Sequence, residues 1–194
     1  MSPQNIILDP IKVPGILAAK IWLNIGSKDD PSGQKGAHQL LGSLLSRGCG
    51  PYSNDQLANL VEGCGAGLRC DCHEDGLLIS LKCSDIDASR LLPLMGWMIT
   101  NPHLEEDQIL LERDLSLQAL QRQKENPFQL TFDGWRQLAY GDGPYGHDPL
   151  GLINDVKNLN RKKLLPLAEN LVHSEQIIAI AGTFNSNMKD QLAN

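Results

Sequence analysis

The chain of 194 residues lacks the features that mark a nucleic-acid or membrane protein. Lys and Arg number 17 against 23 Asp and Glu, so the net charge is −6, whereas binding to a phosphate backbone needs a basic surface. No apolar stretch approaches the roughly 20 residues of a membrane-spanning helix, and no polybasic segment would attract an anionic membrane. The sequence therefore predicts that neither nucleic acid nor a membrane is a partner.

Signals for export and for common cofactor sites are also missing. The polar start, Met1–Asn5, does not resemble a secretory signal. Five cysteines, an odd number, argue for reduced thiols rather than a framework of disulfides. No predicted helix opens on Gly-x-Gly-x-x-Gly, and the sequence has no P-loop and no Gly-x-Ser-x-Gly. We therefore expect a cytoplasmic protein.

What is present is an ordinary globular composition, 41% hydrophobic and 21% charged, in a length that suits one domain over residues 1–194. Apolar patterns predict strands over residues 6–8, 16–25, 68–73, 77–83 and 176–182. Stripes at helical spacing predict helices over residues 37–45, 86–100, 104–124, 128–139 and 160–172, with another after the capping box Ser53-x-x-Gln56. This order predicts an α+β fold, a mostly antiparallel sheet with helices on one face.

The first long strand and the hairpin carry more detailed expectations. Residues 16–25 are nearly all apolar, which predicts a central strand buried on both faces. A two-residue turn at Asp75-Gly76 would pair Cys72 with Ile79, Cys70 with Leu81, and Leu68 with Cys83. One face of the hairpin is then apolar, and the other face carries Arg69, Asp71 and His73.

Residues 26–42 read GSKDDPSGQKGAHQLLG, an acidic, Gly-rich loop that follows an apolar strand and enters a helix. Other landmarks follow in order: Gly65-Ala66-Gly67, Thr100-Asn101-Pro102, Tyr140–Gly146 and Ala179–Gly182. Together, over about residues 6–183, these segments resemble the pitrilysin/insulinase family of zinc metallopeptidases, which includes the mitochondrial processing peptidases. The resemblance implies the N-terminal half of such a peptidase.

The resemblance also implies a set of zinc-site positions. In the family, Gly-x-Ala-His-x-x-Glu-His supplies two histidine ligands and a glutamate base, and a glutamate of the later long helix is the third ligand. Here the first histidine is His38, but the base position is Leu41 and the second ligand position is Gly42. Alignment on Asn126-Pro127 places the third ligand at Ala119. One imidazole cannot hold a catalytic zinc, so no catalytic residue and no cofactor are expected.

The family pattern then implies a non-catalytic, zinc-less homologue. Family members pair two halves in a chain, and some assemblies combine a zinc-bearing subunit with a partner that has lost its zinc motif. We expect such a partner, which binds peptide or unfolded polypeptide and associates with a zinc-bearing homologous subunit or with further copies of itself. The strand over residues 68–73 is the candidate peptide-binding edge, with Arg69, Asp71 and His73 as contacts.

Three other readings stay open. The chain could be an active zinc metalloendopeptidase with unusual ligands, for instance His38, Glu112 and a cysteine, or it could be a purely structural scaffold. Cys70-x-Cys72-His73 could bind zinc or act in redox chemistry, but core packing is favoured because His73 points to the opposite face from Cys72.

Gly42, inside a helix, is expected where another backbone approaches closely.

Overall fold

A five-stranded sheet forms the base of the molecule in the computed structural model, which describes residues 5–11 and 15–183. The strand order is β1-β7-β2-β6-β5. Only β1 and β7 run parallel, and the other neighbours are antiparallel. The sheet strands are β1 (Ile6–Pro10), β2 (Ile16–Leu23), β5 (Gly67–Cys72), β6 (Leu77–Ser84) and β7 (Gln176–Gly182). The predicted α+β class with a mostly antiparallel sheet is confirmed.

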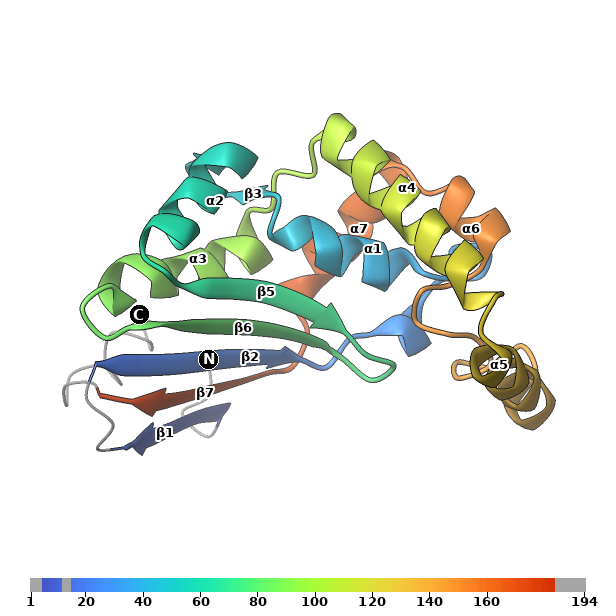
Figure 1. The fold of residues 1–194 in the computed structure, drawn as a ribbon, viewed down its shortest axis with the longest axis horizontal. Coiled ribbons are helices and arrows are strands. Elements are labelled where there is room, and N and C mark those ends of the chain that lie inside the picture. The colour runs from blue at the N-terminus through green and yellow to red at the C-terminus, as the bar shows by residue number, and fades with distance from the viewer. Residues whose placement is uncertain (1–4, 12–14, 184–194) are drawn as a thin grey trace.

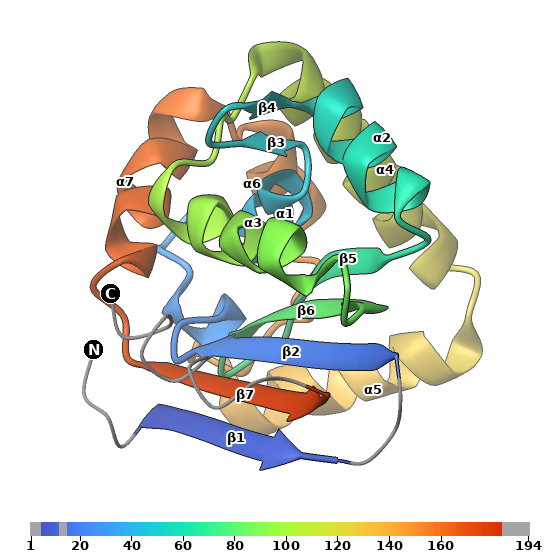
Figure 2. The same cartoon turned by 90° about the vertical axis from the view of Figure 1, so that its left-hand side faces the viewer.

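The long helices other than α5 lie on one side of the sheet (Figures 1 and 2). α5 lies beyond the end at which β5 and β6 turn (Figure 1). A short 3₁₀ helix, η2 (Ser27–Asp29), and a small ribbon of β3 (Gly48–Cys49) and β4 (Tyr52–Ser53) complete the fold. The α-helices are α1 (Ala37–Leu45), α2 (Asn54–Gly63), α3 (Ala88–Thr100), α4 (Glu106–Gln123), α5 (Pro127–Tyr140), α6 (Ile153–Lys157) and α7 (Arg161–Leu171).

Local sequence signals account for most of these boundaries. The side chain of Ser53 accepts a hydrogen bond from the backbone N–H of Gln56, and the Gln56 side chain accepts one from the backbone N–H of Ser53, so the predicted capping box is present. Asn101-Pro102 follows α3, and Asn126 caps α5 through bonds to the backbone N–H groups of residues 128 and 129. No helix in the described ranges is both long and apolar enough to span a membrane.

The prediction that the strand over residues 16–25 is buried on both faces is wrong. Leu17, Ala19, Ile21 and Leu23 are buried under the helices, whereas Ile16 and Lys20 on the other face are exposed. β2 is central in the sheet, but the helices cover only one face at these positions. Apolar residues such as Ala18 and Trp22 thus sit on an open, partly exposed face, and the composition of the run misled the prediction.

The predicted register of the hairpin is also wrong, by two residues. Cys72 pairs with Leu77, Cys70 with Ile79 and Leu68 with Leu81, so the turn residues are Glu74-Asp75. Gly76 belongs to the strand side of the turn, where a Cβ atom would overlap the ring of Trp22. A shift of two residues keeps every side chain on its predicted face, so the assignment of the two faces is confirmed.

Candidate functional site

The helix α1 begins at a buried carboxylate. Asp30 Oδ2 accepts a hydrogen bond from the backbone N–H of Gly36 at 2.6 Å, and Oδ1 accepts one from the N–H of His38 at 2.9 Å. The His38 ring is bonded to the same Oδ1 through Nδ1 at 2.8 Å. Asp30 therefore satisfies free N–H groups at the start of α1 and also orients the imidazole.

The turn before α1 also meets a distant segment of the chain. Gly36 adopts φ 97°, and a Cβ atom there would lie 2.5 Å from the carbonyl oxygen of Leu150. A Cβ on Gly151 would overlap the carbonyl oxygen of Lys35. The N–H of Lys35 donates to Asp155 at 2.9 Å, across 120 residues of sequence. Only glycine permits this crossing of two backbones.

Of the four positions that the family uses for its zinc site, only the first, His38, has a metal-binding side chain here. His38 and Leu41 have no exposed surface, and His38 Nε2 has no hydrogen-bond partner. The surroundings of Gly42 correct the expectation of a close backbone, because its neighbours are side chains. A Cβ atom on Gly42 would lie 3.3 Å from Leu77 Cδ2 and 3.5 Å from Cys70 Sγ. Side chains of the hairpin thus fill the place of the second ligand.

The long helix α4 packs beside α1 but brings no further ligand. Ala119 is partly buried and has no metal-binding group. Glu112 is buried and engaged by Arg47, whose Nη2 and Nε lie 2.5 and 2.7 Å from Glu112 Oε1. In the part of the chain that the structure describes, no three His, Cys, Asp or Glu side chains come together as a metal site. The residues present do not fit zinc.

The cysteines behave as core residues. All five are free, and Cys49 and Cys83 are buried. Burial raises the pKa of Cys49 and Cys83 to about 11 and that of Cys72 to about 12. Burial also raises the pKa of Cys70, with help from Cys72 and Asp71. The thiols of Cys49, Cys70, Cys72 and Cys83 therefore stay protonated at neutral pH, which disfavours metal binding and redox reactivity.

The three residues proposed as peptide contacts do not form one group in the structure. β5 is an edge strand, with β6 as its only neighbour among the described strands. Arg69 and Asp71 lie on the open face and pair with each other, Nε to Oδ2 at 3.0 Å. His73 lies outside the strand, is exposed, and has its ring centroid 6.1 Å from that of Trp22.

A row of exposed rings on α5 and the loop that follows is a feature that sequence reasoning missed. Successive ring centroids lie 5.4–6.1 Å apart from one end of this aromatic row to the other. Phe128 is 73% exposed and Trp135 is 52% exposed. The only signal was the spacing of these residues, which an ordinary buried helix face would also show. The aromatic row consists of Phe128, Phe132, Trp135, Tyr140 and Tyr145.

Two contacts attach the aromatic row to the hairpin turn. The Tyr145 hydroxyl donates to Asp75 Oδ1 at 2.7 Å. Arg136, buried and stacked under Phe132 at 5.0 Å, donates to the carbonyl oxygen of His147 and pairs with Glu74. The edge of β5, its turn and the aromatic row therefore form one continuous stretch of the molecule.

A hollow of about 600 Å³ lies on the inner side of α5, between α4 and residues 146–155. Asp133 and Asp148 line it and share the side-chain amide of Gln129, which donates to each at 3.0 Å. Burial, together with Asp148, raises the pKa of Asp133. His147 also lines the hollow, and its Nε2 has no partner. Two close carboxylates in a hollow provide a place for a positive charge.

Comparison with known proteins agrees with this fold. The family model for insulinase, peptidase family M16, matches residues 16–150, and the chain belongs to this family. An uncharacterized zinc protease of Mycobacterium leprae is 21% identical over 91% of the chain, and the mitochondrial-processing peptidase subunit beta of Neurospora crassa is 22% identical over 82%. The peptidase M16 inactive domain from Pseudomonas fluorescens superposes on 97% of the chain with a TM-score of 0.86 at 19% identity.

The chain spans less than half the length of these similar proteins. It covers 43% of the Mycobacterium protein, 34% of the Neurospora subunit and 46% of the Pseudomonas chain. At these identities, the solved structure establishes the shared fold alone.

Proposed function

We propose that this chain is a non-catalytic, zinc-free member of the M16 family that binds peptide for a peptidase assembly. One observation carries the proposal: the family fold surrounds a zinc-site position that is packed with Leu41, Leu77 and Cys70. A lone imidazole with its Nδ1 bonded to Asp30 cannot by itself hold and activate a metal-bound water. The Pseudomonas structure, which shares this fold, is described as a peptidase M16 inactive domain.

The edge of β5 supplies the backbone part of peptide binding. An edge strand has unpaired N–H and C=O groups that an extended peptide can match, which gives affinity without sequence selectivity. Arg69 and Asp71 flank this edge and largely neutralise each other. They therefore contribute modestly, and the backbone contacts dominate.

The aromatic row and the hollow supply contacts for side chains. Exposed rings such as Trp135 and Phe128 bury apolar side chains and stack on cationic ones. The carboxylates of Asp133 and Asp148 favour a basic side chain in the hollow behind them. The favoured ligand is an extended peptide with apolar residues and at least one Lys or Arg, in keeping with a net charge of −6.

A non-catalytic half acts only with a partner. The partner in this proposal is a zinc-bearing homologue, and a second copy of this chain is the other possibility. The free thiols suit the cytoplasmic location that we propose.

The direct test measures binding of a fluorescein-labelled extended peptide of alternating valine and lysine by anisotropy. The matched control is the same peptide methylated at alternate backbone nitrogens, which cannot pair with a strand edge. We expect the first peptide to bind and the methylated one to bind at least tenfold more weakly. Equal binding of both would disprove strand addition, and binding of neither would disprove the proposed function.

Substitutions separate the side-chain contacts from the edge. Trp135→Ala removes an exposed ring, and Asp133→Asn removes a charge from the hollow. We expect each to weaken binding of the peptide, with Asp133→Asn losing its effect when lysine is replaced by norleucine in the probe. Leu138→Ala, at a side chain that is 90% exposed and outside the aromatic row, is the control.

A further inference from the structure

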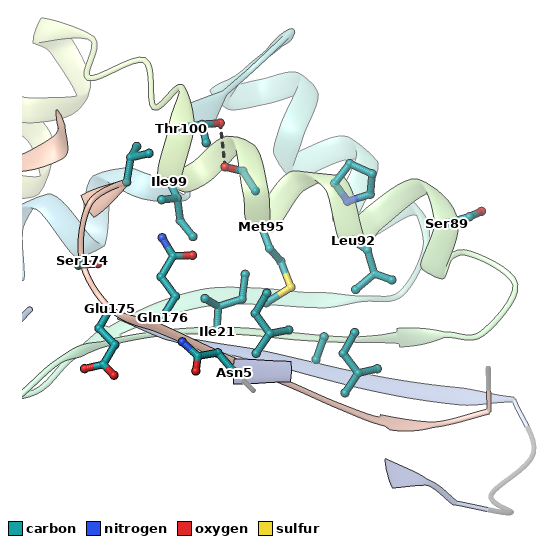
Figure 3. Close-up of a pocket in the computed structure, with 16 residues that line it drawn as sticks. Asn5, Ile21, Ser89, Leu92, Met95, Ile99, Thr100, Ser174, Glu175 and Gln176 are labelled. Atoms are coloured by element: carbon teal, nitrogen blue, oxygen red, sulfur yellow. Dashed lines mark hydrogen bonds between the residues drawn. The ribbon is translucent and has the colours of Figure 1, made fainter. Parts of the chain in front are cut away.

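The open face of the sheet carries a patch of positive charge, although the net charge of the chain is −6. The helices cover the other face, where Figure 3 shows Met95 of α3 reaching down toward the sheet above Ile21 of β2. Because side chains alternate along a strand, Lys20 points away from the helices. Lys82 of β6 and Arg69 of β5 lie on the same open face. We call Lys20, Arg69 and Lys82 the basic patch.

The register of the sheet gathers the basic patch around one serine. Lys20 pairs with Ser80, and Ser80 pairs with Arg69, so the three residues form one row across β2, β6 and β5. Lys82 follows Ser80 by two positions along β6, which keeps it on the same face. Residues opposite each other in a sheet have Cβ atoms about 5 Å apart, and diagonal neighbours lie about 7–8 Å apart. Each of the three cationic residues therefore lies within about 8 Å of Ser80.

The basic patch is only partly neutralised. Arg69 pairs with Asp71, with Nε 3.0 Å from Oδ2. Lys20 and Lys82 are exposed and form no ion pair with any residue that the structure describes. Between them, Ser80 Oγ is buried and has no hydrogen-bond partner in the same part of the chain. Like charges at this spacing repel one another, and an anion placed among them relieves the repulsion.

The side chains next to the basic patch are small or apolar. Ala18 lies between Lys82 and Ala181, and Ala179 lies beside Lys20. Small residues leave room for the side chains of a partner, and apolar residues provide surface for them to bury. The open face therefore fits a ligand that has both carboxylates and apolar groups. The adjoining row across the sheet is apolar and consists of Ile177, Trp22 and Leu78.

We propose that the open face of the sheet binds an acidic segment of another protein, with Asp or Glu carboxylates on the basic patch and apolar side chains on the adjoining row. Charge complementarity favours a carboxylate-bearing partner, and the apolar row favours a protein segment over an inorganic anion or a lipid headgroup. Because the net charge of −6 repels an acidic partner at a distance, the attraction is local and depends on salt.

This surface is distinct in charge preference from the peptide site proposed above. The hollow beside α5 favours a basic side chain, whereas the basic patch favours an acidic one. The two sites therefore need probes of opposite charge, and either proposal can fail without the other.

The test uses the full chain and a fluorescein-labelled peptide of alternating leucine and glutamate, with binding followed by anisotropy. Alternate backbone nitrogens of this peptide are methylated, so that it cannot add to the edge of β5. We expect it to bind, and the same peptide with glutamine in place of glutamate to bind about tenfold more weakly. Binding should also weaken between about 0.05 M and about 0.5 M sodium chloride, because salt screens exposed charges.

Substitutions assign the binding to the basic patch. Lys20→Gln and Lys82→Gln should each weaken binding by about two- to fivefold, which is the range expected for one exposed ion pair. Lys162→Gln removes the same charge from an exposed position on α7 and should leave binding unchanged. All three residues are exposed, so circular dichroism should show the parent fold in each variant. Binding of the valine–lysine probe should not change in Lys20→Gln or Lys82→Gln.

The following results would overturn the proposal. Equal binding of the glutamate and glutamine peptides would exclude recognition of carboxylates, and equal effects of Lys20→Gln and Lys162→Gln would place the binding elsewhere. A peptide with serine in place of leucine should bind more weakly, and equal binding would show that the apolar row has no part. Vesicles of phosphatidylserine that bind through Lys20 and Lys82, without binding of the acidic peptide, would assign the basic patch to a membrane surface instead.

Discussion

The imidazole of His38 and the carboxylate of Asp30 meet through Nδ1 and Oδ1 at 2.8 Å, with neither side chain exposed. An ionised carboxylate can only accept hydrogen bonds, so Nδ1 is the donor. Asp30 receives this bond and two more from the backbone at the start of α1. The histidine of the family motif here completes the first turn of a helix.

Asp30→Ala should destabilise the fold strongly. It leaves three buried donors without an acceptor, at a cost of about 1–3 kcal/mol each, so we expect a loss of at least about 3 kcal/mol. The measurement is urea unfolding followed by circular dichroism. Asp55→Ala, in the exposed first turn of α2, is the control and should stay within about 0.5 kcal/mol of the parent. Equal losses in the two variants would show that the hydrogen bonds to Asp30 do not stabilise the start of α1.

The Arg47–Glu112 pair should contribute far more to the free energy of unfolding than the Arg69–Asp71 pair. Arg47→Ala leaves the Glu112 carboxylate buried and unpaired, for which we expect a loss of about 3 kcal/mol. Arg69→Ala breaks an exposed pair and should cost less than about 1 kcal/mol. Double-mutant cycles by urea unfolding measure both couplings. A coupling as small for Arg47–Glu112 as for the exposed pair would contradict the structural role given to Glu112.

Restoring a zinc site requires space for the new side chains as well as the missing ligands. Leu41→Glu, Gly42→His and Ala119→Glu supply the missing groups, but Leu77 and Cys70 fill the space around position 42. We expect the triple variant to retain little zinc, and the same variant with Leu77→Ala and Cys70→Ala to retain one equivalent through gel filtration. Elemental analysis gives the stoichiometry. The control adds His38→Ala to the five substitutions; undiminished zinc there would show that the metal binds elsewhere.

Thiol reactivity should follow burial. At about pH 7.5, iodoacetamide should leave Cys49, Cys70, Cys72 and Cys83 unmodified in the folded protein, because burial raises their pKa values and blocks access. In urea all five cysteines should react. Peptide mass spectrometry identifies the modified residues, and rapid native labelling of Cys70 or Cys72 would reopen a metal or redox role for them.

Stability should fall in alkaline solution, because burial raises the pKa of the cysteine thiols in the folded protein. An unfolded cysteine has a pKa of about 8.5, whereas folded Cys49 and Cys83 have pKa values of about 11. Above about pH 8.5 the unfolded chain therefore loses protons that the folded chain keeps, and the free energy of unfolding decreases up to about pH 11. Urea midpoints at about pH 7 and pH 10 measure the decrease. Cys49→Ala should reduce the difference between the two urea midpoints. An unchanged difference would show that groups other than Cys49 cause the decrease in stability.

Features specified by neighbouring residues could be predicted from the sequence. β7 over residues 176–182 and α1 over residues 37–45 have the expected bounds, because each has a local apolar pattern with a clear stop. The faces of the β5–β6 hairpin followed from simple alternation. Its register did not, because Gly76 is pressed against Trp22, more than fifty residues earlier in the chain.

In the candidate site, too, local features could be predicted from the sequence and contacts between distant residues could not. Replacement of the zinc ligands at Leu41 and Gly42 is visible in the motif itself. The bond from His38 to Asp30 is not, because His38 lies eight positions after Asp30 and no capping rule reaches that far. The aromatic row was missed because spacing cannot say whether an apolar face of a helix is buried, and only the placement of α5 beyond the sheet decides that.

The crossing of the backbones at Gly36 and Gly151 bears on the order in which the chain folds. The start of α1 is fixed by Asp30, which is close in sequence, and by Asp155, which is 120 residues away from its partner Lys35. During synthesis, residues 37–45 leave the ribosome long before residue 155 exists. We therefore expect α1 to gain its final protection from hydrogen exchange late, after residue 155 has been made.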